Sequence, residues 1–186
     1  MVVGTGASPA LGSAVEALRQ LFDAAACSVA LVDEEGAELA FVAADGAGAA
    51  EIVGQTVPVG RGIAGWAAMS GQPIAVSDVQ ADPRFARDVA ESTAYVPRAI
   101  LAAPLMGGDG DVLGVLSVLD PSVDQTSDWV LRVLGTGASL VALLVEGGPS
   151  APDGDPGPGG LDVLGRDVLR VVEAWRSGDP GGSAHR

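Results

Sequence analysis

Residues 98–119 read RAILAAPLMGGDGDVLGVLSVL, two apolar runs on either side of a short glycine-rich segment. Each run has the length and apolar character of a buried strand. The segment GGDG between them, residues 107–110, contains the glycines that a tight hairpin turn favours. We therefore predict two adjacent antiparallel strands, Ile100 to Met106 and Val112 to Leu119.

A second hairpin is predicted nearer the N-terminus. Ser28 to Val32 has the pattern of a buried strand, residues 33–36 (DEEG) that of a turn, and Leu39 to Ala43 that of the returning strand. A further short strand is predicted from Pro73 to Val76. Because the strands are joined by tight turns rather than by crossover helices, we expect an antiparallel sheet.

Helices are predicted before, between and after these hairpins. Ser8-Pro9 predicts a helix start, with a capping hydroxyl followed by proline in the first turn. A short helix is predicted from Gly60 to Gly71, and a last one from Thr126 or Ser127 to about Glu146. Residues 77–97 are polar and irregular, with one helical turn expected around Phe85. The fold class is α+β: a central antiparallel sheet with helices packed on its faces.

The chain beyond this predicted domain, residues 1–146, has a different composition. Residues 147–160 consist of glycine, proline, aspartate and serine, with Ala151 the only apolar residue, which predicts a flexible linker. Residues 161–176 predict a short amphipathic helix, and residues 177–186 a disordered tail. Apolar residues in the predicted helix repeat at heptad spacing and could dock on a partner protein: Leu161, Leu164, Val168, Val171 and Trp175.

The composition argues against several classes of protein. The formal net charge is −14, from 24 acidic and 10 basic residues, so a phosphate backbone or an anionic membrane would be repelled. No apolar run approaches the roughly 18 residues that a membrane span needs. Cys27 is the single cysteine, which excludes a disulfide within the chain and favours a cytoplasmic location. We expect no nucleic-acid or membrane partner.

Three pieces of the sequence together resemble the GAF family of small-molecule sensor domains, over about Ala10 to Glu146. They are residues 60–66 (GRGIAGW) followed by 71–73 (GQP), residues 78–79 (DV) with 82–85 (DPRF), and residues 98–105 (RAILAAPL) followed by 110–118 (GDVLGVLSV). The resemblance implies a GAF/PAS-like sheet, a pocket roofed by the segment after Pro73, and a regulatory protein of bacterial type without catalytic residues.

The resemblance also implies candidate ligand-binding residues, by their position in the family pattern. Aromatic walls with a few polar groups are typical of ligand pockets. For Trp66 and Phe85 the alternative is a place in the core, and for Arg61 and Arg98 it is the surface or an ion pair with Asp78. The full set is Arg61, Trp66, Asp78, Arg84, Phe85, Tyr95, Arg98 and Ser117.

The functional prediction is a non-catalytic module that binds a small metabolite and relays a signal to a partner protein. The alternative is a ligandless scaffold for dimerisation or docking. An enzyme similar to the family's methionine-sulfoxide reductases is disfavoured, because those use several cysteines and Cys27 has no second thiol. We expect no cofactor and no metal: His185, the single histidine, lies in the predicted tail, so an axial haem ligand or a zinc cluster is missing.

The last predicted helix of the domain is apolar on two sides, which predicts a homodimer through the first and last domain helices. One stripe is Val130, Leu134, Val141 and Val145, and the other is Trp129, Val133, Leu140 and Leu143. The alternative is that the first helix covers the second stripe within the same chain.

Overall fold

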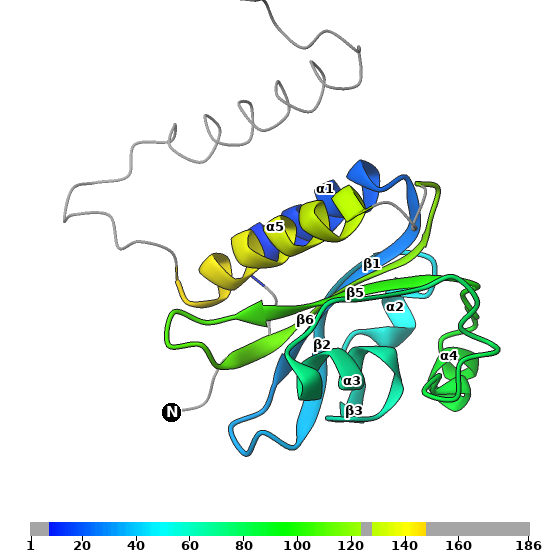
Figure 1. The fold of residues 1–186 in the computed structure, drawn as a ribbon, viewed down its shortest axis with the longest axis horizontal. Coiled ribbons are helices and arrows are strands. Elements are labelled where there is room, and N and C mark those ends of the chain that lie inside the picture. The colour runs from blue at the N-terminus through cyan, green and yellow to red at the C-terminus, as the bar shows by residue number, and fades with distance from the viewer. Residues whose placement is uncertain (1–7, 124–127, 148–186) are drawn as a thin grey trace, which may run out of the picture. The chain divides into compact units, whose positions relative to one another are not determined.

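The computed structural model describes residues 8–123 and 128–147, and the predicted linker, amphipathic helix and tail fall outside them from residue 148 onward. In this part of the chain the helices and strands alternate irregularly (Figure 1). In chain order they are α1 (Pro9–Leu21), β1 (Ala24–Val32), β2 (Glu38–Gly46), α2 (Ala49–Ile52), β3 (Thr56–Pro58), α3 (Gly62–Ser70), β4 (Ile74–Val76), α4 (Arg87–Ser92), β5 (Ile100–Met106), β6 (Val112–Pro121) and α5 (Asp128–Val145).

The strands form one six-stranded sheet in the order β3-β2-β1-β6-β5-β4, and every neighbouring pair is antiparallel. This confirms the predicted α+β class with a central antiparallel sheet. Both predicted hairpins are present, as β1–β2 and β5–β6. They are joined side by side through β1 and β6, a pairing between distant segments that neither hairpin reveals by itself.

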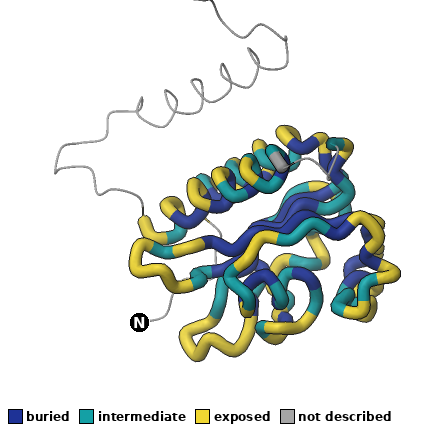
Figure 2. The backbone as a smooth tube through the Cα atoms, in the orientation of Figure 1, coloured by how far each residue is buried: buried dark blue, intermediate teal, exposed yellow. Residues whose placement is uncertain are grey.

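The strands contribute side chains to two cores on opposite faces of the sheet. Val29 and Leu116 belong to one core, which also contains residues of α1 and α5. Their sequence neighbours Ala30 and Val115 belong to the other, which contains residues of α3. Figure 2 shows the buried residues gathered in the sheet and on the helix sides that face it.

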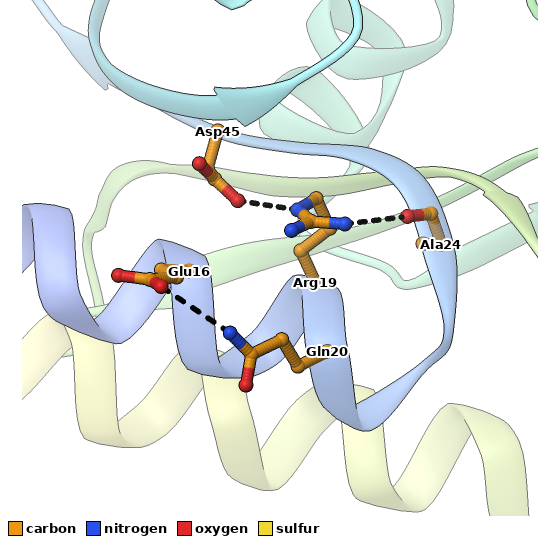
Figure 3. A network of polar contacts seen from close by, with 5 residues as sticks. All are labelled: Glu16, Arg19, Gln20, Ala24 and Asp45. Atoms are coloured by element: carbon orange, nitrogen blue, oxygen red, sulfur yellow. Dashed lines mark hydrogen bonds and ion pairs between the residues drawn. The ribbon is translucent and has the colours of Figure 1, made fainter.

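α1 begins at Pro9 as predicted, but the expected serine cap is absent: the Ser8 side chain makes no capping hydrogen bond. Its backbone carbonyl instead accepts hydrogen bonds from the N–H groups of Leu11 and Gly12, while proline occupies the first turn, where no N–H partner is needed. At its other end the helix is tied to the β1–β2 hairpin. Figure 3 shows Arg19 donating hydrogen bonds to the Asp45 carboxylate and the Ala24 carbonyl.

α5 lies beside α1 on the same face of the sheet (Figure 1). Val130, Leu134 and Val141 are buried, as their predicted stripe requires. The two helices approach closely at Gly137, where an added Cβ would lie 2.8 Å from the Leu18 side chain. This contact covers only part of the second stripe, because Leu140 and Leu143 remain exposed.

Residues 77–97 contain a helix, but not around Phe85 as predicted. α4 begins at Arg87, and residues 82–85 form a turn in which the Phe85 N–H donates to the Asp82 carbonyl oxygen. The Asp82 carboxylate accepts a hydrogen bond from the Arg84 N–H at 2.9 Å, which fixes the non-helical turn. This local hydrogen bond therefore prevents the helix from beginning before Phe85.

Candidate functional site

A cavity of about 120 Å³ lies between the sheet and the layer formed by α2, α3 and α4. Its floor consists of small side chains that stand opposite one another on adjacent strands. Ser28 on β1 pairs with Ala44 on β2 and with Ser117 on β6. All three line the cavity, and their small volumes leave space that larger residues would fill.

The walls of the cavity come from the short helices above the sheet and are mostly apolar. They include Ile52 of α2, Ile63 of α3, and Val89 of α4. α3 is held close to the sheet edge at Gly65, where a Cβ would lie 2.7 Å from the Pro58 carbonyl oxygen, so only glycine fits there. This close packing brings the first turn of α3 to the cavity wall.

The cavity includes half of the residues that the sequence singles out. Its lining contains Arg61, Phe85, Tyr95 and Ser117. Its lining does not contain Trp66, Asp78, Arg84 or Arg98. Arg98 lines a separate hollow with Ser77 and Asp120, and Asp78 is exposed.

Arg61 stands at the rim, with its side chain half exposed. Its guanidinium donates a hydrogen bond to the Asp88 carboxylate at 2.5 Å. The partner is thus Asp88 on α4, whereas the sequence suggested an ion pair with Asp78. The contact links the start of α3 to α4 across the cavity mouth.

Trp66 and Arg84 contact each other instead of the cavity. The Arg84 guanidinium lies 4.9 Å from the centroid of the Trp66 ring, a cation–π geometry. It also donates two hydrogen bonds to the Asp82 carboxylate, at 2.9 and 2.6 Å. These hydrogen bonds lower the pKa of Asp82 to about 2. Together, the contacts of Arg84 with Trp66 and Asp82 hold the segment before α4 against α3.

Tyr95 anchors the other end of that segment. Its hydroxyl donates a hydrogen bond to Asp120, whose other carboxylate oxygen accepts the N–H groups of Arg98 and Ala99, both at 2.8 Å. Burial, followed by the nearby Asp120 carboxylate, raises the pKa of Tyr95 to about 12. Arg98 therefore contributes its backbone to this anchor, and the tyrosine ring lines the cavity.

The GAF domain family model matches residues 8–145, which include every helix and strand described above. The chain belongs to the GAF domain family. Structures of GAF domains share its fold: one from a phosphoenolpyruvate-protein phosphotransferase of Coxiella burnetii has a TM-score of 0.65 at 21% identity, covering 78% of this chain and 85% of that one. The second GAF domain of DevS from Mycobacterium smegmatis has a TM-score of 0.59 at 20% identity, covering 75% and 94%.

An enzyme is also among the similar structures. The free methionine-R-sulfoxide reductase of Neisseria meningitidis, solved with its substrate, has a TM-score of 0.62 at 24% identity and covers 77% of this chain and 80% of that one. At such identities the likeness concerns the fold alone.

Curated relatives match a shorter part of this GAF domain. The dual 3',5'-cyclic-AMP and -GMP phosphodiesterase 11A of Takifugu rubripes is 32% identical over 66 residues, which are 36% of this chain and 7% of that protein. The corresponding phosphodiesterase 11 of Drosophila melanogaster is 39% identical over 61 residues, 33% of this chain and 4% of that protein. The chain therefore spans only a small fraction of the length of these relatives.

Ser28 is one of the cavity residues of this GAF domain that the sequence pattern did not single out. The signal lay in the alternation of β1, which puts the small residues Ala26, Ser28 and Ala30 on one face. The role of Ser28 in the cavity floor depends on its pairing with Ser117. This pairing follows from the β1–β6 register and cannot be inferred from either strand alone.

Cys27, the next residue back, is fully buried and belongs to the opposite core, although part of the residue also lines the cavity. Burial raises the pKa of its thiol to about 12, which keeps the thiol protonated. Among the described residues, no three His, Cys, Asp or Glu side chains are grouped to hold a metal ion. Within the same residues, no helix is long and apolar enough to cross a membrane.

Proposed function

We propose that this GAF domain is a non-catalytic sensory module that binds a small metabolite in the cavity between Ser28, Ser117 and α2–α4. The observation that carries the proposal is the cavity itself, whose apolar wall and two floor hydroxyls have the make-up of a ligand site. The segment above it is held by polar contacts at both ends, Arg61–Asp88 and Tyr95–Asp120. A ligand that binds more tightly to one arrangement of these contacts would increase the population of that arrangement.

Two functions that the names of the similar proteins suggest are disfavoured by the residues of this chain. Cyclic nucleotides carry a charged phosphate, and among the described residues the one charged side chain that lines the cavity, Arg61, is already paired with Asp88. A methionine-sulfoxide reductase that works through cysteine needs a reactive thiolate, and the one thiol of this chain is buried and protonated. We therefore propose neither activity for this chain. We place the module in the cytoplasm, because a single cysteine cannot form an internal disulfide.

The test is a screen of melting temperature against metabolites, followed by a variant that fills the cavity. A ligand present at 100 times its Kd adds about 2.7 kcal/mol to the free energy of unfolding. Ala44→Leu should abolish the effect, because the larger side chain grows into the floor. The matched control is Ala17→Leu, the same enlargement at an exposed position of α1, which should bind normally. Binding that survives Ala44→Leu would remove the cavity from the proposal.

The signal would pass to a partner protein through the heptad-spaced residues 161–175, which lie outside the described residues. Deleting residues 161–186 should leave the melting temperature nearly unchanged and abolish binding of that partner in a pull-down. Loss of folding on deletion would assign this segment to the core instead.

A second candidate function is a dimeric scaffold. It is favoured by α5, on which Leu140 and Leu143 are 54% and 51% exposed and Leu144 is exposed beside them. A homodimer through α1 and α5 would cover these leucines. Light scattering at micromolar concentration distinguishes it from a monomer.

A further inference from the structure

We propose that the cavity takes a compact, uncharged molecule the size of one six-membered ring, bearing a single hydroxyl or carbonyl group that Ser28 and Ser117 hold. This rests on the proposed function, because it names the class of ligand for the same site. It follows from three properties of the cavity: its volume, its two free hydroxyls and its lack of charge.

The volume sets the size of the ligand. The cavity measures about 120 Å³. Pockets for drug-sized ligands begin at about 300 Å³. A dry protein cavity of about 150 Å³, in contrast, binds benzene. The volume of the present cavity therefore matches a single ring or a short branched chain.

The two floor hydroxyls require a polar partner. Ser28 is 7% exposed and Ser117 is 5% exposed, and both line the cavity. They stand directly opposite each other on β1 and β6. Neither side chain has a hydrogen bond to any other part of the chain that the structure describes. Since buried hydroxyls are nearly always hydrogen-bonded, this pair points to a partner inside the cavity.

The charges around the cavity argue for a neutral ligand. Of the side chains that line it within the described residues, Arg61 alone is charged, and its guanidinium is paired with Asp88 at the rim. An ionised ligand would lose its hydration without gaining a free counter-charge. The first turn of α3 also lines the cavity and favours negative charge, so a monoanion is the competing class that the experiment must distinguish.

The experiment compares three probes of one ring size: phenol, benzene and benzoate. Titrations followed by NMR give a Kd for each with the wild type, with Ser28→Ala/Ser117→Ala and with Ser139→Ala. Ser139 is an exposed serine of α5 and serves as the matched control. We expect the wild type to bind phenol about 10-fold more tightly than benzene, the effect of two hydrogen bonds at about 0.7 kcal/mol each. Benzoate should bind more weakly than phenol.

The double serine variant should lose this 10-fold preference while binding benzene as well as the wild type does, and Ser139→Ala should retain it. Because the variant removes unpaired hydroxyls, its melting temperature should not fall; each single variant should lose part of the preference. Absence of phenol binding, equal binding of phenol and benzene, or tightest binding of benzoate would overturn the assignment.

Failure of this inference differs from failure of the proposed function. Suppose that a metabolite from the thermal screen no longer binds to Ala44→Leu but binds normally to the double serine variant. This result would support the sensory cavity and overturn only the proposed ligand class. A metabolite whose binding survives Ala44→Leu overturns both.

Discussion

The two faces of the sheet are built from the same strands and differ in how completely they are filled. Toward α1 and α5, β1 and β6 present Val29, Leu116 and Val118, all fully buried. Toward α2, α3 and α4 the adjacent positions are Ser28 and Ser117, and between them and the helices lies the cavity. A shift of one residue along a strand thus separates a packed core from a candidate binding site.

The helices above the two faces differ in the same sense. α1 and α5 have 13 and 18 residues and cover their face with continuous apolar stripes. α2 and α4 have four and six residues, too short to supply such a stripe. Both faces have an apolar core, but on the second face α3 alone supplies a buried apolar stretch of helix, and polar contacts at the ends of the short elements hold the rest. We expect mutations on the first face to affect stability and mutations on the second to affect binding.

The largest expected effect is on the filled face. Leu134→Ala should lower the free energy of unfolding by about 2–5 kcal/mol, because the side chain is fully buried against the sheet and leaves a cavity. Chemical denaturation measures this change. Ala44→Leu on the other face should cost far less, since its added atoms enter existing space. Comparable losses in the two variants would contradict the difference between the faces.

Asp120→Ala tests the polar anchor of the cavity face. The carboxylate accepts hydrogen bonds from Tyr95, Arg98 and Ala99, so we expect a loss of about 1–3 kcal/mol in denaturation. The matched control is Asp23→Ala. Asp23 also has a positive φ, 45° against 48° for Asp120, but its carboxylate makes no hydrogen bond within the described residues. An equal loss in both variants would mean that backbone strain, and not the anchor, explains the effect.

A smaller effect is expected at alkaline pH on the filled face. Burial raises the pKa of Cys27 from 9.0 to about 12, so the folded state disfavours the thiolate that the unfolded chain forms. The resulting stability is fully present below pH 9 and is lost as the pH rises from 9 through 12. At pH 10 the loss is on the order of 1 kcal/mol.

Cys27→Ala should flatten this part of the pH profile of unfolding, whatever its effect at neutral pH. Tyr95, whose pKa is also about 12, titrates over the upper part of the same window, so Tyr95→Phe is the companion variant. A profile from pH 9 to 10 that is identical in wild type and Cys27→Ala would show that the thiol is accessible in the folded state.

The fold followed from the sequence wherever one segment contained its own signal. The apolar runs of β5 and β6 and the turn between them predicted that hairpin, and α3 ends at Gly71 as its glycine suggested. The pairing of β1 with β6 could not be predicted in this way, because its residues are about ninety positions apart and no local pattern encodes their register. α4 was misplaced because the Asp82 turn overrides the helical tendency near Phe85.

The site was predictable only in part, for a related reason. Phe85, Tyr95 and Ser117 do reach the cavity. Trp66 and Arg84 have the right residue types for a pocket, but they contact each other, and such side-chain pairing is decided by the folded arrangement of α3 and the following segment. Ser28 could not be predicted as a site residue, because a single serine in an apolar strand indicates a site only when its neighbour on β6 is known.

The smallest expected effect on stability lies at the outer surface of the same helix that contains Leu134. Leu140→Gln/Leu143→Gln should change the free energy of unfolding of the monomer by less than about 0.5 kcal/mol, because both side chains are already more than half exposed. Sedimentation velocity should nevertheless change if α5 is a dimer interface: the wild type would sediment as a dimer and the variant as a monomer. A monomeric wild type would remove the scaffold function, and a loss of stability close to that of Leu134→Ala would show that these leucines belong to the filled face.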